Sequence, residues 1–166
     1  MAIVRISQMT AILLERARNY GITAEELLAG VKSGDASLFK AAEDEHFKYD
    51  QFLSYAAEHE EDLETAIKSS YQMKFNTMGG LQIWLKEVFS IEAGMDFAAS
   101  PGRLENIKLP VEKINRLQET LAGNWVILLT GHQNSQSVLK EKINAQNPQE
   151  HHTINLLIQH EYQAQL

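Results

Sequence analysis

Residues 124–130, with the sequence NWVILLT, decide which class of fold the chain adopts. A short apolar run rich in branched side chains is compatible with a buried strand and with a buried turn of helix. Elsewhere apolar residues recur mostly at helical spacing, and no segment alternates as a partner strand would. We therefore expect residues 124–130 to be helical. The predicted fold is all-α, a bundle of roughly seven or eight helices in one compact domain or two small lobes.

The helix predictions depend on apolar stripes and on residues that begin or end helices. Gly21 is placed to end a first helix, and Thr23 with Glu26 forms a capping box for the second. Thr77 can cap a helix with an uninterrupted apolar face, and Pro110 can stand at the start of another. The expected helices cover 6–20, 24–34, 36–57, 63–71, 78–89, 111–121, a segment that is capped by Asn134 or Ser135 and runs to 145, and 148–166.

These segments predict three regions along the chain. Residues 1–90 form an N-terminal helical region with an acidic helix pair, 91–110 a connecting segment, and 111–166 a C-terminal helical region. The helical period lapses in the connecting segment, which contains Pro101, Gly102 and Pro110. The last region has only about 56 residues, so we expect it to pack on the first rather than fold alone. Leu166 falls inside a helical pattern, which leaves open whether the natural chain continues.

The absence of cysteine excludes several kinds of chemistry. Disulfides, thiolate metal sites, iron–sulfur clusters and cysteine nucleophiles all require a residue that the chain lacks. The N-terminus carries Arg5 inside its apolar stretch and does not resemble a secretory leader. No uncharged apolar run approaches the roughly 18 residues of a membrane span. We expect a cytoplasmic protein without a membrane partner.

The net charge of −7 is concentrated in one segment. Residues 41–64 contain nine acids and one base, Lys48, whereas the rest of the chain has 13 acids and 14 bases. The acids are Glu43, Asp44, Glu45, Asp50, Glu58, Glu60, Glu61, Asp62 and Glu64. Such a run is either a solvated helix face or a docking surface for a basic partner. The docking surface would consist of Glu58, Glu60, Glu61, Asp62 and Glu64.

The closing stretch, residues 149–166, is the clearest candidate for metal chemistry. It contains His151, His152 and His160, but not the pair of histidines four apart that a metalloprotease helix uses. On a helical wheel, His152 and His160 point away from the apolar stripe, whereas Glu161 lies in its middle. A carboxylate at that position needs a buried partner, because burial destabilises its charged form.

His46 is the candidate partner for Glu161. It falls on the apolar face of the expected helix 36–57, one turn after Glu43. The metal hypothesis joins His46, His151 or His160, and Glu161 around one zinc or iron(II) ion inside the bundle. The alternative is that these histidines are solvated or structural, with no cofactor bound.

A helix-turn-helix around residues 60–89 is a further hypothesis. Gln82 would read a base edge, and Lys74 and Asn76 would hold phosphates. The chain has no cluster of basic residues, and the acidic run precedes this segment, so both features argue against nucleic-acid binding.

We expect a small cytosolic binding or regulatory protein of the adaptor kind, with residues 41–64 as its docking surface. The chain has no phosphate-binding loop and no complete catalytic set, which favours a protein that is not an enzyme. The first alternative is a metal-dependent, hydrolase-like helical bundle that uses His46, His151, His160 and Glu161. The second is the helix-turn-helix. The expected partner is a protein, and self-association is left open.

Overall fold

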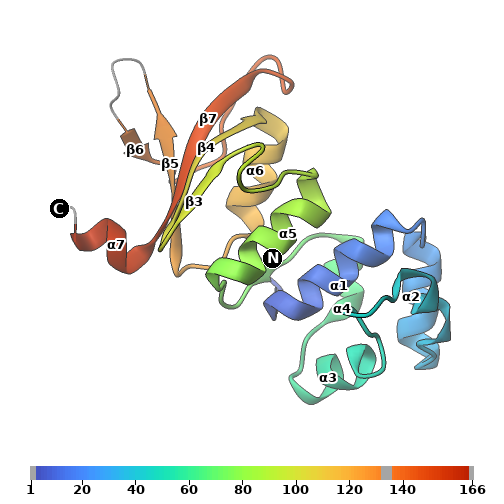
Figure 1. The fold of residues 1–166 in the computed structure, drawn as a ribbon. Helices are drawn as coiled ribbons and strands as arrows, with labels where there is room; N and C mark the ends of the chain where they lie inside the picture. Colours follow the sequence, from blue (N-terminus) through green and yellow to red (C-terminus); the bar gives the residue numbers. More distant parts are fainter. Residues whose placement is uncertain (1–2, 132–135, 165–166) are drawn as a thin grey trace. The chain divides into compact units, whose positions relative to one another are not determined.

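The computed structural model describes residues 3–131 and 136–164 and divides the chain into two compact units, Met1–Lys74 and Phe75–Leu166. The proposed caps Asn134 and Ser135 and the end of the chain at Leu166 lie outside the described residues. The described residues form eight helices, one of them a 3-10 helix, and seven strands in two sheets (Figure 1). The protein is therefore mixed α/β, and the predicted all-α helical bundle is wrong.

The first unit is mainly helical. Its elements are β1 (Arg5–Ile6), α1 (Gln8–Asn19), α2 (Ala24–Ser33), the 3-10 helix η1 (Ser37–Ala42), α3 (Phe52–Glu58), α4 (Leu63–Lys68) and β2 (Gln72–Met73). The two short strands are parallel, with Arg5 opposite Gln72. Strand pairing therefore joins the two ends of this unit, although about 65 residues separate them.

The predicted helix boundaries near residue 20 are confirmed. Gly21 has φ of 84°, a conformation that is nearly free of strain only for glycine, and follows the end of α1. The side chain of Thr23 accepts from the N–H of Glu26, whose carboxylate accepts from the N–H of Thr23. This reciprocal cap begins α2.

The single helix expected over residues 36–57 is wrong. The 3-10 helix η1 ends at Ala42, and a loop of residues 43–51 separates it from α3. In this loop Asp44 accepts hydrogen bonds from the N–H groups of His46 and Phe47, and Glu43 accepts one from the N–H of Tyr49. An aspartate that binds nearby backbone N–H groups, as Asp44 does, competes with helix formation.

Three aromatic rings form the centre of the first unit. Phe39 stacks on Tyr49 with their centroids 5.2 Å apart, and Phe52 meets both rings edge-on at 5.2 and 5.4 Å. The Tyr49 hydroxyl donates to the carbonyl oxygen of Leu13 at 2.6 Å. The rings therefore join η1, the loop and α3 to one another, and the hydroxyl joins them to α1.

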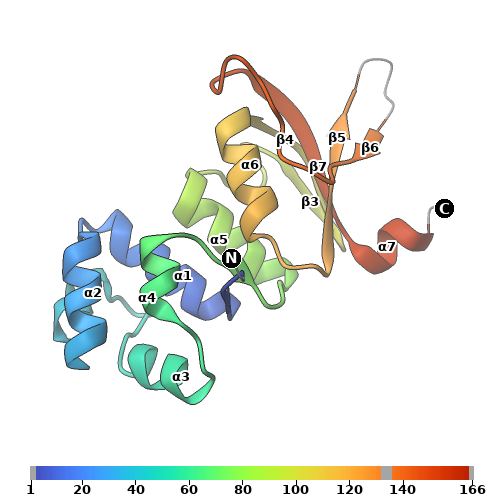
Figure 2. The same ribbon diagram turned by 180° about the vertical axis from the view of Figure 1, so that it is seen from behind.

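The second unit is a sheet with helices. Its elements are α5 (Met78–Phe89), β3 (Ala98–Ser100), β4 (Arg103–Pro110), α6 (Val111–Thr120), β5 (Trp125–Thr130), β6 (Gln136–Val138), β7 (His151–Ile158) and α7 (Gln159–Ala164). The strands follow the spatial order β3-β4-β7-β5-β6, and all neighbours are antiparallel. Figures 1 and 2 show α5 and α6 on the same side of this sheet.

The run at 124–130 is a strand because its partner comes from the end of the chain. Strand β5 pairs with β7, with Trp125 opposite Ile158 and Leu129 opposite Ile154. Residues 154–157 of β7 are all buried, so this strand lacks the alternation that marks a half-exposed strand. Its pattern therefore does not identify β7 as a strand, and the single helix predicted over residues 148–166 is wrong because residues 151–158 form β7.

Two other segments also differ from the helical prediction. The expected connecting segment contains β3 and all of β4, and β4 pairs with β7. Within the described part of the expected helix that ends at residue 145, residues 136–138 form β6 and no helix is present. The helices at 78–89 and 111–120 are confirmed, with Thr77 capping α5 and Pro110 preceding α6.

Asn76 is the main polar anchor of the second unit. Its buried side-chain oxygen accepts from the N–H of Ala122, and its carbonyl oxygen accepts from the Asn124 amide and the Trp125 indole. These bonds fix the connection between α6 and β5 beside the start of α5. None of the helices in the described ranges 3–131 and 136–164 has the length and apolar character needed to span a bilayer.

Candidate functional site

The structure does not assemble the predicted metal ligands. His46 is exposed in the loop of the first unit, whereas the other three residues lie in the second. His151 begins β7 and His160 lies in α7, at opposite ends of a strand that is about 26 Å long when extended. Across the described residues, no three His, Asp or Glu side chains are grouped as a metal would require.

Glu161, the expected buried ligand, lies beside a turn instead. Its Cγ is close to the backbone of Gly102, where an added Cβ would lie only 2.8 Å away. Its side chain therefore packs on the turn between β3 and β4. His152, on β7, lies 3.7 Å from the carboxylate of Glu150.

The proposed phosphate-binding residues of the helix-turn-helix both have internal roles. Lys74 pairs with Glu61 at 2.8 Å, and Asn76 is buried. The Gln82 side chain donates to the carbonyl oxygen of Met78. Helices α4 and α5 are separated by residues 69–77, which include β2, whereas a helix-turn-helix has a turn of about three or four residues.

The five acids of the expected docking surface fall into two groups. Glu61 points inward, because its side chain is 0% exposed and binds Ser7, Thr10 and Lys74. Glu58 and Glu60 are exposed, Asp62 caps α4 by accepting from the N–H of Thr65, and Glu64 pairs with Lys68. Hydrogen bonds from the N–H and hydroxyl of Thr65 lower the pKa of Asp62. Four of the five residues are therefore accessible to a partner.

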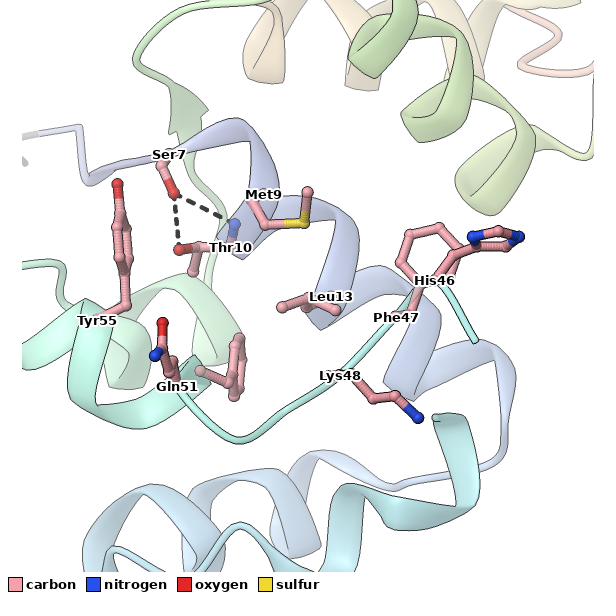
Figure 3. A pocket seen from close by; sticks show the side chains of 10 residues that line it. Ser7, Met9, Thr10, Leu13, His46, Phe47, Lys48, Gln51 and Tyr55 are labelled. Atoms are coloured by element: carbon pink, nitrogen blue, oxygen red, sulfur yellow. Dashed lines mark hydrogen bonds between the residues drawn. The ribbon is translucent and has the colours of Figure 1, made fainter. Parts of the chain in front are cut away.

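The first unit also contains a pocket of about 350 Å³, which is lined by residues from 7–13 and 46–55 (Figure 3). It lies between the start of α1, the loop and α3. Its lining residues are Ser7, Met9, Thr10, Leu13, His46, Phe47, Lys48, Gln51, Phe52 and Tyr55. The volume is in the range of sites that take a small molecule or one or two large side chains.

The pocket is mainly apolar. Leu13 and Phe52 are buried at 6% and 3% exposure, and Phe47 is half-buried. Met9 is 54% exposed and Tyr55 is 38% exposed, so apolar surface continues from the pocket to the outside.

Arg16 holds the loop side of the pocket in place. Its guanidinium donates to the carbonyl oxygen of Ala42 at 2.6 Å and to the carboxylate of Asp44 at 2.9 Å. It also lies 4.5 Å from the centre of the Phe47 ring, within cation–π range. The N–H groups of His46 and Phe47 lower the pKa of Asp44, with a smaller contribution from Arg16. The wall that contains Phe47 is therefore preformed.

Two polar side chains that line this pocket have no hydrogen-bond or ion-pair partner among the described residues. The side chains of Lys48 and Gln51 are exposed, and among the described residues neither has a hydrogen-bond or ion-pair partner. Tyr55 stacks on His59, with the ring centroids 3.9 Å apart. The side chains of Lys48 and Gln51 are therefore free to contact a ligand.

Three exposed carboxylates are close in sequence to residues that line the pocket. Glu45 directly precedes the pocket residue His46, Asp50 precedes Gln51, and Glu58 lies one turn after Tyr55. Within residues 3–131 and 136–164, these three acids have no ion-pair partner. By contrast, Asp44, Glu61 and Glu64 are paired. Three exposed acids without an ion-pair partner among the described residues are therefore close in sequence to residues that line the pocket.

The pocket is not predictable from the sequence, although some of its lining residues follow recognisable patterns. Met9 and Leu13 lie on one helical stripe, and aromatic residues recur at positions 47, 49, 52 and 55. In the sequence, these apolar and aromatic residues look like ordinary core residues. The pocket between them exists because the loop after η1 replaces the predicted helix. Comparisons of the chain with protein-family models, curated protein sequences and solved structures found no significant match.

Proposed function

We propose that this chain is a small cytoplasmic protein of the adaptor kind, whose first unit binds a segment of a protein partner. The partner segment places an apolar side chain in the pocket, and its basic side chains face Glu45, Asp50 and Glu58. The observation that carries this proposal is a mainly apolar pocket whose lining residues are close in sequence to exposed carboxylates that have no ion-pair partner among the described residues.

Charge and burial have different roles in this proposal. Burial of one leucine-sized side chain contributes about 1.5–3 kcal/mol, which corresponds to roughly tenfold to a hundredfold in affinity. The exposed carboxylates accelerate encounter with a basic segment and exclude acidic ones, with an effect that salt weakens. The pocket therefore supplies affinity, and the acids supply selectivity.

Labelled peptides provide the test. A panel of nine-residue lysine- and serine-rich peptides, blocked at both ends, would carry leucine, methionine, phenylalanine, tryptophan or serine at the centre. Fluorescence anisotropy with the full chain should show saturable binding of at least one apolar peptide, at least about tenfold tighter than the serine peptide. Binding should weaken as salt rises.

Met9→Asp is the diagnostic variant, because Met9 lines the pocket yet is 54% exposed. It should abolish the preference for the apolar peptide without unfolding the protein. Met95→Asp is the matched control, since Met95 is 82% exposed in the second unit and does not line the pocket. Equal binding of the apolar and serine peptides, or unchanged binding by Met9→Asp, would refute the proposal.

A further inference from the structure

Residues 139–150 form a strap that joins β6 to β7 in the second unit. All of the strap is described, and it contains no helix or strand. The Asn115 side-chain oxygen, on α6, accepts from the N–H of Ile143 at 2.6 Å, and the Asn115 amide donates to the carbonyl oxygen of Ile143 at 2.9 Å. The Gln118 amide donates to the carbonyl oxygen of Lys140 at 3.3 Å. Asn115 and Gln118 therefore bind the backbone of the strap rather than its side chains.

The last residues of the strap cap the start of α6. Pro110, which precedes this helix, provides no capping side chain. The N–H groups of Val111 and Glu112 donate instead to the carbonyl oxygens of Glu150 at 2.8 Å and Pro148 at 3.1 Å. The first four N–H groups of a helix have no partner within the helix, so these bonds satisfy two of them. Along the strap, the contacts thus move from the last turns of α6 back to its start.

Burial contributes little to holding the strap. Its side chains are exposed except for those of Leu139, Ile143 and Ala145, which are half-buried. The ion pair of Lys142 with Glu119 is exposed and spans 3.9 Å, and such a pair adds little stability. A segment with few buried apolar contacts opens at a lower free energy than the core of the same protein. By contrast, β7 is paired on both edges, with β4 and β5.

We propose that the strap opens from α6 as a unit while the sheet stays folded, and that Asn115 is the contact that closes it. Opening releases the side chains of Asn115 and Gln118 and the N–H groups of Val111 and Glu112. In the closed state these groups bind backbone atoms only, so in the open state they are available to the backbone of another extended segment. The strap therefore controls access to the outer side of α6. This device lies in the second unit and does not depend on the pocket of the first.

Amide hydrogen exchange of the full chain, measured by NMR in urea below the unfolding transition, tests the opening. The Ile143 amide should exchange at least about tenfold faster than the Leu156 amide of β7. Its rate should hardly change with urea, because a local opening exposes little surface, whereas the Leu156 rate should rise steeply. Equal rates with the same dependence on urea would overturn the proposal, since the strap would then open only when the unit unfolds. An Ile143 amide that exchanges as fast as in an unstructured peptide would overturn the closed contact.

Three variants assign the opening to the strap. Asn115→Ala removes both bonds to Ile143 and should speed exchange of the Ile143 amide about tenfold or more. Asn144→Ala is the matched control, because Asn144 is exposed on the strap and has no hydrogen-bond partner among the described residues; it should exchange like the wild type. Asn76→Ala weakens the unit away from the strap, so it should speed the Leu156 amide and leave the Ile143 amide unchanged.

Trypsin gives an independent measurement, because Lys140 and Lys142 are exposed on the strap. Cleavage after these lysines, followed by mass spectrometry, should be about tenfold faster in Asn115→Ala than in the wild type and unchanged in Asn144→Ala and Asn76→Ala. If Asn115→Ala leaves the Ile143 amide and the cleavage rate unchanged, Asn115 does not close the strap. If Asn76→Ala speeds the Ile143 amide as much as the Leu156 amide, the strap does not open separately from the sheet.

Discussion

Glu61 accepts a hydrogen bond from the backbone N–H of Ser7 at 2.6 Å, although the two residues are 54 positions apart. The same carboxylate accepts from the Thr10 hydroxyl at 2.7 Å and pairs with the Lys74 ammonium at 2.8 Å. It therefore fixes the start of α1 to the end of β2 within the first unit. Because Ser7 and Thr10 also line the pocket, Glu61 positions one of its walls.

Glu61→Gln should lower the free energy of unfolding by about 2–3 kcal/mol. The glutamine amide has no negative charge to pair with the Lys74 ammonium. Its NH2 group would also face another donor, either the Ser7 N–H or the Lys74 ammonium. Denaturation by urea, followed by far-ultraviolet circular dichroism, measures the loss. Glu58→Gln is the control, because Glu58 is exposed, and it should change stability by less than about 0.5 kcal/mol. Equal losses in the two variants would contradict the role assigned to Glu61.

Asp44 should make the pocket loop sensitive to acid. Its folded-state pKa is lowered, chiefly by hydrogen bonds from the N–H groups of His46 and Phe47. The ionised carboxylate therefore stabilises the fold fully above its unfolded pKa of about 3.9, and this contribution is lost as pH falls through the lower folded pKa. The difference in unfolding free energy between wild type and Asp44→Asn should be constant above about pH 5 and shrink below about pH 4.

Denaturation of both proteins over a series of pH values checks this dependence. Asp50→Asn serves as the comparison, since Asp50 is an exposed acid on the same loop with no hydrogen-bond partner among the described residues. If the difference in unfolding free energy between wild type and Asp44→Asn stays constant down to about pH 2.5, the charge of the Asp44 carboxylate does not stabilise the loop.

Asn76→Ala should destabilise the second unit by about 2 kcal/mol. Removal of the side chain leaves the buried N–H of Ala122 without its acceptor, and such an unsatisfied donor costs about 1–3 kcal/mol. Tryptophan fluorescence reports this unit, because Trp84 and Trp125 both lie in it. Asn144→Ala, at an exposed position of the same unit, should leave the urea midpoint nearly unchanged. A midpoint for Asn76→Ala that equals the control would be inconsistent with an anchor at this position.

Gly102→Ala should cost about 1–3 kcal/mol for two separate reasons. Gly102 has φ of 73°, where a side chain is strained, and an added Cβ would lie 2.8 Å from the Cγ of Glu161. Adding Glu161→Ala should relieve only the contact with Glu161, because the Cβ would still lie 3.1 Å from Cγ2 of Ile158 and the backbone strain remains. Gly123→Ala is the control, because a Cβ there meets nothing within 4 Å. Complete rescue by Glu161→Ala would show that backbone strain contributes nothing, and a wild-type melting temperature for Gly102→Ala would contradict both reasons.

The helix ends were predictable because their determinants are local. The cap formed by Thr23 and Glu26, the cap at Thr77 and the turn at Gly21 each depend on residues only a few positions apart. Local pattern alone also led to the incorrect prediction of one helix over residues 36–57. Its apolar spacing fits a helix, but Asp44 and Glu43 bind the backbone of the following residues and form a loop instead. His46 was consequently assigned to a buried helical face that does not exist.

Composition and local capping thus determined that the chain is acidic between 41 and 64, free of cysteine, and helical at 8–19, 24–33, 78–89 and 111–120. Only the tertiary structure decided that NWVILLT is a strand, because its partner β7 follows more than 20 residues later and is buried too continuously to alternate. It also decided that Glu61 points inward while Lys48 borders a pocket. Side-chain burial and strand pairing depend on which distant segments of the chain come into contact, and these contacts cannot be predicted from the local pattern of a single sequence.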